Sequence, residues 1–74
     1  MKGAEVRRIR EKIGLDRHEF AKVFGLSGYR TVMNIETDFR SPSRLTIILL
    51  RALDSLPESK ARALIALLRR HSDD

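Results

Sequence analysis

Cysteine and tryptophan are absent from this sequence of 74 residues, and aromatic residues make up only 5% of it. Without cysteine, no disulfide can stabilise the small core of so short a chain, and this absence is typical of cytosolic proteins. The longest apolar run, residues 45–50, is interrupted by Thr46 and falls far short of the ~20 residues that cross a bilayer. The first residues, MKGAEVRRIRE, are charged and lack the apolar core of a signal peptide. We therefore expect a cytoplasmic protein with no membrane partner.

The residue types that carry most enzyme and metal chemistry are few and scattered. The two histidines, His18 and His71, lie far apart in the sequence and there is no cysteine, so no metal site is expected. No glycine-rich phosphate loop follows a strand pattern, and no spacing of serine, histidine and acid indicates a catalytic triad. A chain this short also leaves little room for a catalytic cleft. The sequence predicts neither an enzyme nor a cofactor.

Basic residues are what the chain has in excess. Eleven arginines and four lysines stand against ten acidic residues, which gives a net charge of +5. Arginine makes bidentate contacts with phosphate and with guanine, so this balance favours a nucleic-acid partner. Arginine-rich surfaces are also common on soluble helical proteins, and charge alone does not separate the two interpretations.

Hydrophobic residues, 42% of the chain, recur at helical spacing, as in Val6, Ile9 and Ile13. The pattern predicts one all-α domain over residues 1–74 with five helices: residues 3–13, 17–24, 28 or 29 to 37, from a cap at residue 41 or 43 to 56, and 58–71. Asp16 and Glu19 have the spacing of a capping box, and Ser27 is the predicted cap of the third helix. The fourth helix is so apolar that we expect it to be surrounded on most sides.

The stretch 16–36, DRHEFAKVFGLSGYRTVMNIE, has the pattern of two short helices joined by a tight turn. With Val32 at the centre of the buried side of the second helix, Ile35 lies close to that side. The outward face then carries Tyr29, Arg30, Met33 and Asn34. Arginine can bond guanine, asparagine can bond adenine, and methionine or tyrosine can touch a thymine methyl. This is the pattern of a helix-turn-helix that reads the DNA major groove, and the alternative is a solvated helix face.

Together these motifs resemble the Cro/C1-type (Xre) helix-turn-helix family of phage repressors and bacterial antitoxins. The resemblance covers residues 5–53, rests on IREKIGLDRHEFAKVFGLS, TVMNIE, RSPS and LLRAL, and is especially to small antitoxin or phage autorepressors. It implies a compact, lambda-repressor-like domain whose second and third helices form the helix-turn-helix. It also implies an ion pair between Arg10 and Glu36. The base-reading positions that it implies are Tyr29, Arg30 and Asn34, with Met33 beside them.

The same resemblance implies phosphate contacts at the start of the second helix and around the loop after the third. These positions are Arg17, Ser27, Arg40, Ser43 and Arg44. Three residues depart from the family pattern: Gly28 is an extra residue, Arg17 replaces a glutamine, and Asp38 replaces a glycine. We expect Gly28 to absorb an unusual backbone angle, because glycine tolerates conformations that other residues avoid.

The last predicted helix has more apolar surface than a terminal helix usually needs. Leu64, Ile65 and Leu68 form a stripe that either covers the subunit's own core or joins two subunits, and we favour the dimer interface. The predicted function is a transcriptional regulator: an operon autorepressor that binds a palindromic operator in double-stranded DNA as a homodimer. Its reading helices would lie about 34–36 Å apart. The alternative is a protein–protein adaptor, such as an antitoxin that neutralises a toxin.

Overall fold

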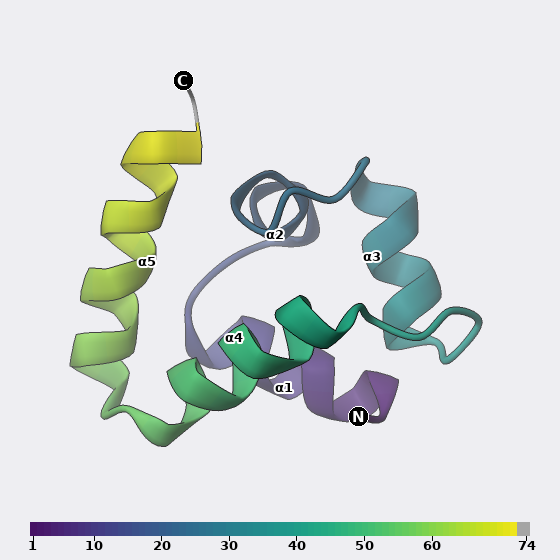
Figure 1. Cartoon of the computed structure of the whole chain (residues 1–74), viewed down its shortest axis with the longest axis horizontal. Helices are drawn as coiled ribbons and strands as arrows, with labels where there is room; N and C mark the ends of the chain where they lie inside the picture. Colours follow the sequence, from purple (N-terminus) through teal and green to yellow (C-terminus); the bar gives the residue numbers. More distant parts are fainter. Residues whose placement is uncertain (73–74) are drawn as a thin grey trace.

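Five helices make up the regular structure of the computed structural model, which describes residues 1–72 (Figure 1). They are α1 (Gly3–Lys12), α2 (Arg17–Val23), α3 (Tyr29–Glu36), α4 (Arg44–Ser55) and α5 (Glu58–Ser72). Within the described residues there is no strand, so the predicted all-α class and the predicted order of helices are confirmed. None of these helices has the length and apolar character needed to cross a bilayer.

The boundaries of α1 and α2 follow from local sequence signals. Gly14 ends α1 with φ at +79°, a left-handed conformation that glycine adopts without a Cβ clash. At the start of α2, Asp16 Oδ1 accepts from the Glu19 N–H at 2.8 Å, and Glu19 Oε1 accepts from the Asp16 N–H at 3.0 Å. This is the predicted capping box, and it satisfies two backbone donors reciprocally. Gly25, at φ +67°, follows α2.

The start of α3 differs from the prediction. Ser27 does not cap the helix; its hydroxyl is hydrogen-bonded to Thr31 Oγ1 at 2.6 Å. Gly28 occupies the N-cap position without a side-chain bond, and its φ of 163° is extended backbone that any residue adopts. After α3, Asp38 is left-handed at φ +64°, a conformation for which a short polar side chain is suited.

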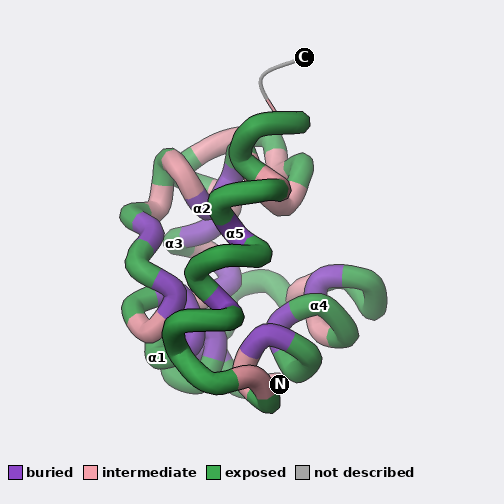
Figure 2. Tube along the Cα trace, turned by 90° about the vertical axis from the view of Figure 1, so that its left-hand side faces the viewer, coloured by how far each residue is buried: buried purple, intermediate pink, exposed green. Residues whose placement is uncertain are grey.

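The core lies where α1, α2 and α3 meet, and is closed by α4 and α5 (Figure 2). The buried hydrophobic residues are Val6, Ile9, Ile13, Leu15, Phe20, Ala21, Val32, Ile35, Leu50, Leu53, Ala61 and Ile65. The beginning of α1 approaches the end of α3 so closely that a Cβ on Gly3 would clash with the Glu36 carbonyl oxygen. Glycine is therefore required at this contact.

Two predictions about apolar surfaces are wrong. The fourth helix is not surrounded: it packs mainly against α1 and α5, so Leu45 and Ile48 remain 65% and 51% exposed. Ile65 is not available to a second subunit, because it is only 2% exposed and belongs to the core of its own chain. Leu68 is half-buried against the same core. The exposed leucines of α5 are Leu64 and Leu67.

An exposed charge cluster links α1 to the end of α4. Arg8 Nη1 and Nη2 donate to the two Asp54 carboxylate oxygens at 3.1 and 2.8 Å. Lys12 Nζ donates to Asp54 Oδ1 at 3.3 Å and to the Asp54 carbonyl at 2.9 Å. The hydrogen bond from Arg8, with help from Lys12, lowers the pKa of Asp54 to about 2.

Candidate nucleic-acid interface

The outward face of α3 carries the side chains that the sequence assigned to base reading. Val32 and Ile35 point into the core, at 0% and 3% exposure. On the other side Tyr29, Arg30 and Met33 are exposed. Asn34, the fourth predicted reader, is half-buried, and its backbone carbonyl accepts from the Arg40 N–H at 3.0 Å. The helix thus offers one arginine, one amide and two apolar groups on a single surface.

Beneath this face lies the ion pair expected between α1 and α3. Arg10 Nε donates to Glu36 Oε2 at 2.6 Å, and Arg10 Nη2 donates to Glu36 Oε1 at 3.3 Å. The two side chains are 10% and 3% exposed. Arg10 Nη1 also donates to the Leu15 carbonyl at 3.0 Å. The pair therefore joins α1, the loop before α2 and the end of α3.

Arg17, predicted to hold a phosphate, has a partner within the chain. Its Nε donates to Glu36 Oε1 at 3.1 Å, so Glu36 accepts from two arginines. The hydrogen bond to Glu36 raises the pKa of the Arg17 guanidinium. The capping box stabilises the first turn of α2, and the Arg17–Glu36 ion pair holds that turn against the end of α3.

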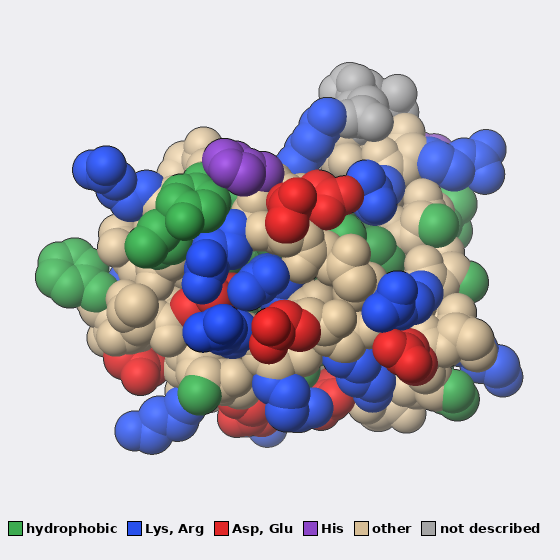
Figure 3. Space-filling model, turned by 180° about the vertical axis from the view of Figure 1, so that it is seen from behind, with side chains coloured by type: hydrophobic (Ala, Val, Ile, Leu, Met, Phe, Trp, Pro, Cys, Tyr) green, Lys and Arg blue, Asp and Glu red, His purple; other side chains and the backbone are tan. Residues whose placement is uncertain are grey.

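His18 belongs to this surface, although no sequence pattern predicted it. Its ring stacks on Tyr29, with centroids 4.8 Å apart and an interplanar angle of 23°. The contact depends on how α2 packs on α3, and a spacing of eleven residues across a turn does not predict it. Figure 3 shows a histidine beside hydrophobic and basic side chains on this side of the molecule.

The other residues predicted to contact phosphate differ in whether their side chains already have hydrogen-bond or ion-pair partners within the chain. The Ser27 hydroxyl is bonded to Thr31, and Ser43 Oγ caps α4 by accepting from the Thr46 N–H at 3.2 Å. Arg40 and Arg44 are exposed, and no ion pair within the described residues engages either guanidinium. Arg40 lies on the loop after α3, and Arg44 is the first residue of α4.

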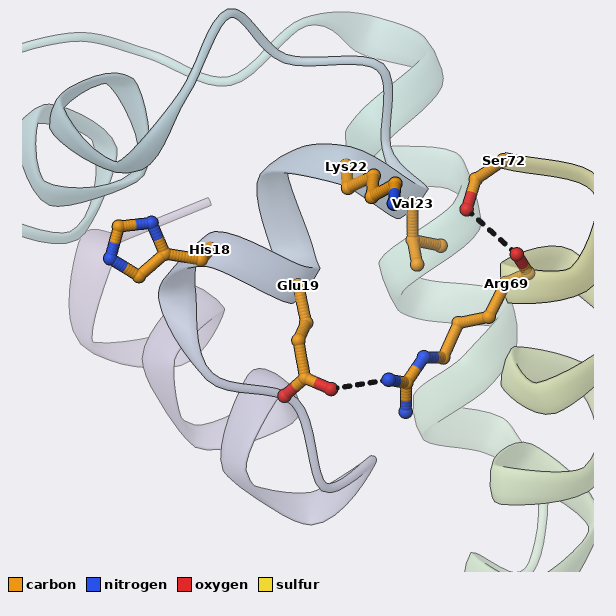
Figure 4. Close-up of a pocket in the computed structure, with 6 residues that line it drawn as sticks. All are labelled: His18, Glu19, Lys22, Val23, Arg69 and Ser72. Atoms are coloured by element: carbon orange, nitrogen blue, oxygen red, sulfur yellow. Dashed lines mark hydrogen bonds and ion pairs between the residues drawn. The ribbon is translucent and has the colours of Figure 1, made fainter. Parts of the chain in front are cut away.

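A shallow cavity of about 220 Å³ lies between α2 and α5 (Figure 4). It is lined by His18, Glu19, Lys22, Val23, Arg69 and Ser72. Glu19 and Arg69 form an ion pair across it, at 2.5 Å. This pair attaches α5 to α2, so we assign the cavity a structural part. Among the described residues no group of three His, Cys, Asp or Glu side chains could hold a metal ion.

Comparison with protein-family models, with curated proteins and with solved structures finds no match to this chain. The surface is therefore characterised by its own chemistry. It combines hydrogen-bonding and apolar groups on α3 with two exposed arginines next to them. Such groups can contact base edges and phosphates, and no nucleophile with an activating base lies among them.

Proposed function

We propose that this chain is a sequence-specific DNA-binding regulator in which α2 and α3 act as a helix-turn-helix. The observation that carries the proposal is the division of α3: Val32 and Ile35 are buried, whereas Arg30 and Met33 face outward. A reading helix needs this division, because one side must be anchored while the other enters the major groove. The tight turn at Gly25 and the buried Ala21 between the helices support the same assignment.

The residues on α3 have distinct roles in this proposal. Arg30 bonds guanine O6 and N7, and Asn34 bonds adenine N6 and N7. Met33 and Tyr29 contact thymine methyl groups. Arg40 and Arg44 hold phosphates on either side of the groove, since phosphate contacts set the register of a reading helix.

We further propose an Xre-type, lambda-repressor-like regulator that acts as an autorepressor of its operon. The sequence motifs of residues 5–53 support this, as does the Arg10–Glu36 ion pair that the family resemblance implied. The simplest mechanism for such a regulator is occupation of the operator. Its occupancy then depends on the concentration of the protein.

A two-fold dimer completes the proposed reader. Leu64 and Leu67 are exposed on α5, and in this proposal they take the place of Ile65 as the apolar contacts between the two subunits. The half-buried Leu68 lies at the edge of this interface. A dimer matches a palindromic operator, because each half-site then meets the same face of one subunit.

The proposal is tested by binding to random-sequence duplex DNA over a series of salt concentrations. Each phosphate that the protein neutralises contributes about −0.9 to the slope of log affinity against log salt. We expect a steep negative slope and a smaller one for the double variant Arg40→Gln/Arg44→Gln. Absence of binding at low salt would rule out the proposed function.

A second candidate function is favoured by α4. Leu45, Ile48 and Leu49 are exposed there, and DNA reading by α3 does not use them. An exposed apolar helix face is typical of a protein interface, so the chain could act as an adaptor or as an antitoxin that binds a partner protein. A complex that forms equally well without duplex DNA and at high salt would favour this function.

A further inference from the structure

Two residues of α2 hold the side chain of Tyr29, the first residue of α3. The Tyr29 ring stacks on His18 with centroids 4.8 Å apart. The guanidinium carbon of Arg17 lies 5.8 Å from the centroid of the same ring, within the range of a cation–π contact. Tyr29 is therefore restrained by both residues although it is 38% exposed.

Arg17 is itself fixed by the last residue of α3. Its Nε donates to Glu36 Oε1 at 3.1 Å, and the Glu36 side chain is 3% exposed. Glu36 is held in turn by Arg10, whose Nε lies 2.6 Å from Glu36 Oε2. A continuous set of contacts therefore runs from the buried ion pair to the ring at the start of α3. The Nε of Arg17 is thus engaged within the chain.

The first turn of α3 has little local stabilisation of its own. Gly28, at the N-cap position, has no side chain that could accept from the first N–H groups, and the Ser27 hydroxyl is bonded to Thr31 Oγ1. A helix that begins without a side-chain cap leaves first-turn N–H groups without that partner. The contacts from α2 therefore restrain the Tyr29 ring at a helix start that has no side-chain cap.

We infer that Arg17 is a positioning residue for Tyr29, and that the stacked Tyr29–His18 pair determines specificity at the edge of the reading face. The role of this pair in DNA specificity rests on the proposed function, whereas the restraint of the Tyr29 ring by Arg17 and His18 does not involve DNA. A ring held in one orientation presents a defined apolar edge to one base step. A ring that moves freely contacts many sequences equally, so pre-organisation gives discrimination.

The restraint can be measured without DNA. Tyr29 is the only tyrosine and there is no tryptophan, so fluorescence excited near the tyrosine band reports on this ring alone. We expect Arg17→Gln and His18→Gln each to lower fluorescence anisotropy and to raise acrylamide quenching. A ring contact of this kind corresponds to about a two- to tenfold change in the restrained population.

The matched control is Arg70→Gln, which removes the same charge from an exposed position on α5. It should leave both signals unchanged. Circular dichroism checks that each variant is folded at the temperature used. His18→Gln leaves the ion pairs of Glu36 intact, so it tests the stack even where Arg17→Gln melts early. Unchanged fluorescence in both α2 variants overturns the inference.

The DNA part uses a duplex enriched by the wild-type protein from a random-sequence pool. Arg17→Gln should lower affinity for the enriched duplex about fivefold or more and leave random DNA unchanged. Equal losses on both duplexes, with a salt slope smaller by about one unit, would make Arg17 a phosphate contact and overturn its positioning role. If the wild type binds no duplex, the proposed function fails, and the fluorescence still decides whether Arg17 restrains Tyr29.

Discussion

The carboxylate of Asp38 accepts a hydrogen bond from the backbone N–H of Gly3, 35 residues earlier in the chain, at 2.8 Å. Gly3 is the first residue of α1, and the first N–H groups of a helix have no partner within the helix. Asp38 thus supplies a cap for α1 from the loop after α3. It does so at φ +64°, where its own backbone is left-handed.

Asp38→Ala should therefore destabilise the fold by about 1–3 kcal/mol. It removes the bond to Gly3 and also places a Cβ without polar compensation in a left-handed conformation. Asp38→Gly loses the bond but relaxes the backbone, so its loss should be smaller. Urea denaturation of the wild type, Asp38→Ala and Asp38→Gly gives the order of their stabilities directly. An equal loss for alanine and glycine would show that the backbone conformation contributes nothing.

Arg10 and Glu36 should behave as a coupled pair. Arg10→Met leaves Glu36 buried with Arg17 as its remaining ion-pair partner among the described residues, which should cost about 3 kcal/mol. Arg10→Met/Glu36→Leu should cost less than the sum of the two single variants, because it leaves no buried charge unpaired: Arg17 loses Glu36, but its side chain is 29% exposed to water. Arg7→Met is the control: its ion pair with Glu11 is exposed on both sides, and such pairs contribute about 0.5 kcal/mol or less. If the loss of stability in the double variant equals the sum of the losses in the two single variants, Arg10 and Glu36 do not interact.

The sequence predicted those features that depend on neighbouring residues. The Asp16–Glu19 capping box and the glycines that end α1 and α2 follow from local backbone chemistry, so spacing alone identified them. The buried side of α3 followed from helical periodicity. The prediction of an unusual backbone angle at Gly28 was wrong, because its φ of 163° is extended.

Features that depend on how helices pack could not be predicted in this way. The His18–Tyr29 stack and the Arg17–Glu36 bond require the relative placement of α2 and α3. Ile65 shares an apolar stripe with its neighbours, and only the position of the other helices decides which part of that stripe is buried. The apolar composition of α4 likewise says nothing about how many helices cover it.

Base reading by α3 predicts a specific pattern of affinity loss. Arg30→Ala and Asn34→Ala should each cost about 1–3 kcal/mol on the enriched duplex, because each removes bonds to one base. Affinity for random duplex should change little for Asn34→Ala, and helical content should stay the same for both. Electrophoretic mobility shift or anisotropy titrations measure this, with Arg70→Ala as the control for lost charge. Equal losses on enriched and random DNA would remove these residues from base reading.

Acid should weaken the fold through Asp54. Its pKa is lowered from 3.8 to about 2 by the hydrogen bond from Arg8 and by Lys12. A carboxylate whose pKa is lowered by folding stabilises the fold at any pH above the pKa that it has in the unfolded chain. That contribution is lost as the pH falls from about 4 towards 2. The pKa of Asp16 is also lowered, chiefly by the Glu19 N–H, and it acts in the same direction. Asp54→Asn should therefore reduce, without abolishing, the fall in melting temperature over this range.

The α5 leucines offer a paired test of the proposed dimer. Leu67 is 47% exposed and Ile65 is 2% exposed, although they lie two residues apart on one helix. Ile65→Glu should unfold the chain, because it buries an unpaired carboxylate in the core. Leu67→Glu should stay folded, since its carboxylate remains in water within one subunit, but should be monomeric if Leu67 faces a second copy.

Sedimentation and operator titration distinguish these outcomes for Leu67→Glu. The expected monomer should bind a single half-site like the wild type and lose the tighter binding to two half-sites, because the advantage of linked sites disappears. Leu64→Glu should repeat the result, as Leu64 is exposed on the same helix. Arg70→Glu places the same acid on an exposed polar position of α5 and should leave the dimer unchanged. Dimers that persist in both leucine variants would move the interface away from α5, and the exposed Leu45 and Ile48 of α4 would then be its next candidates.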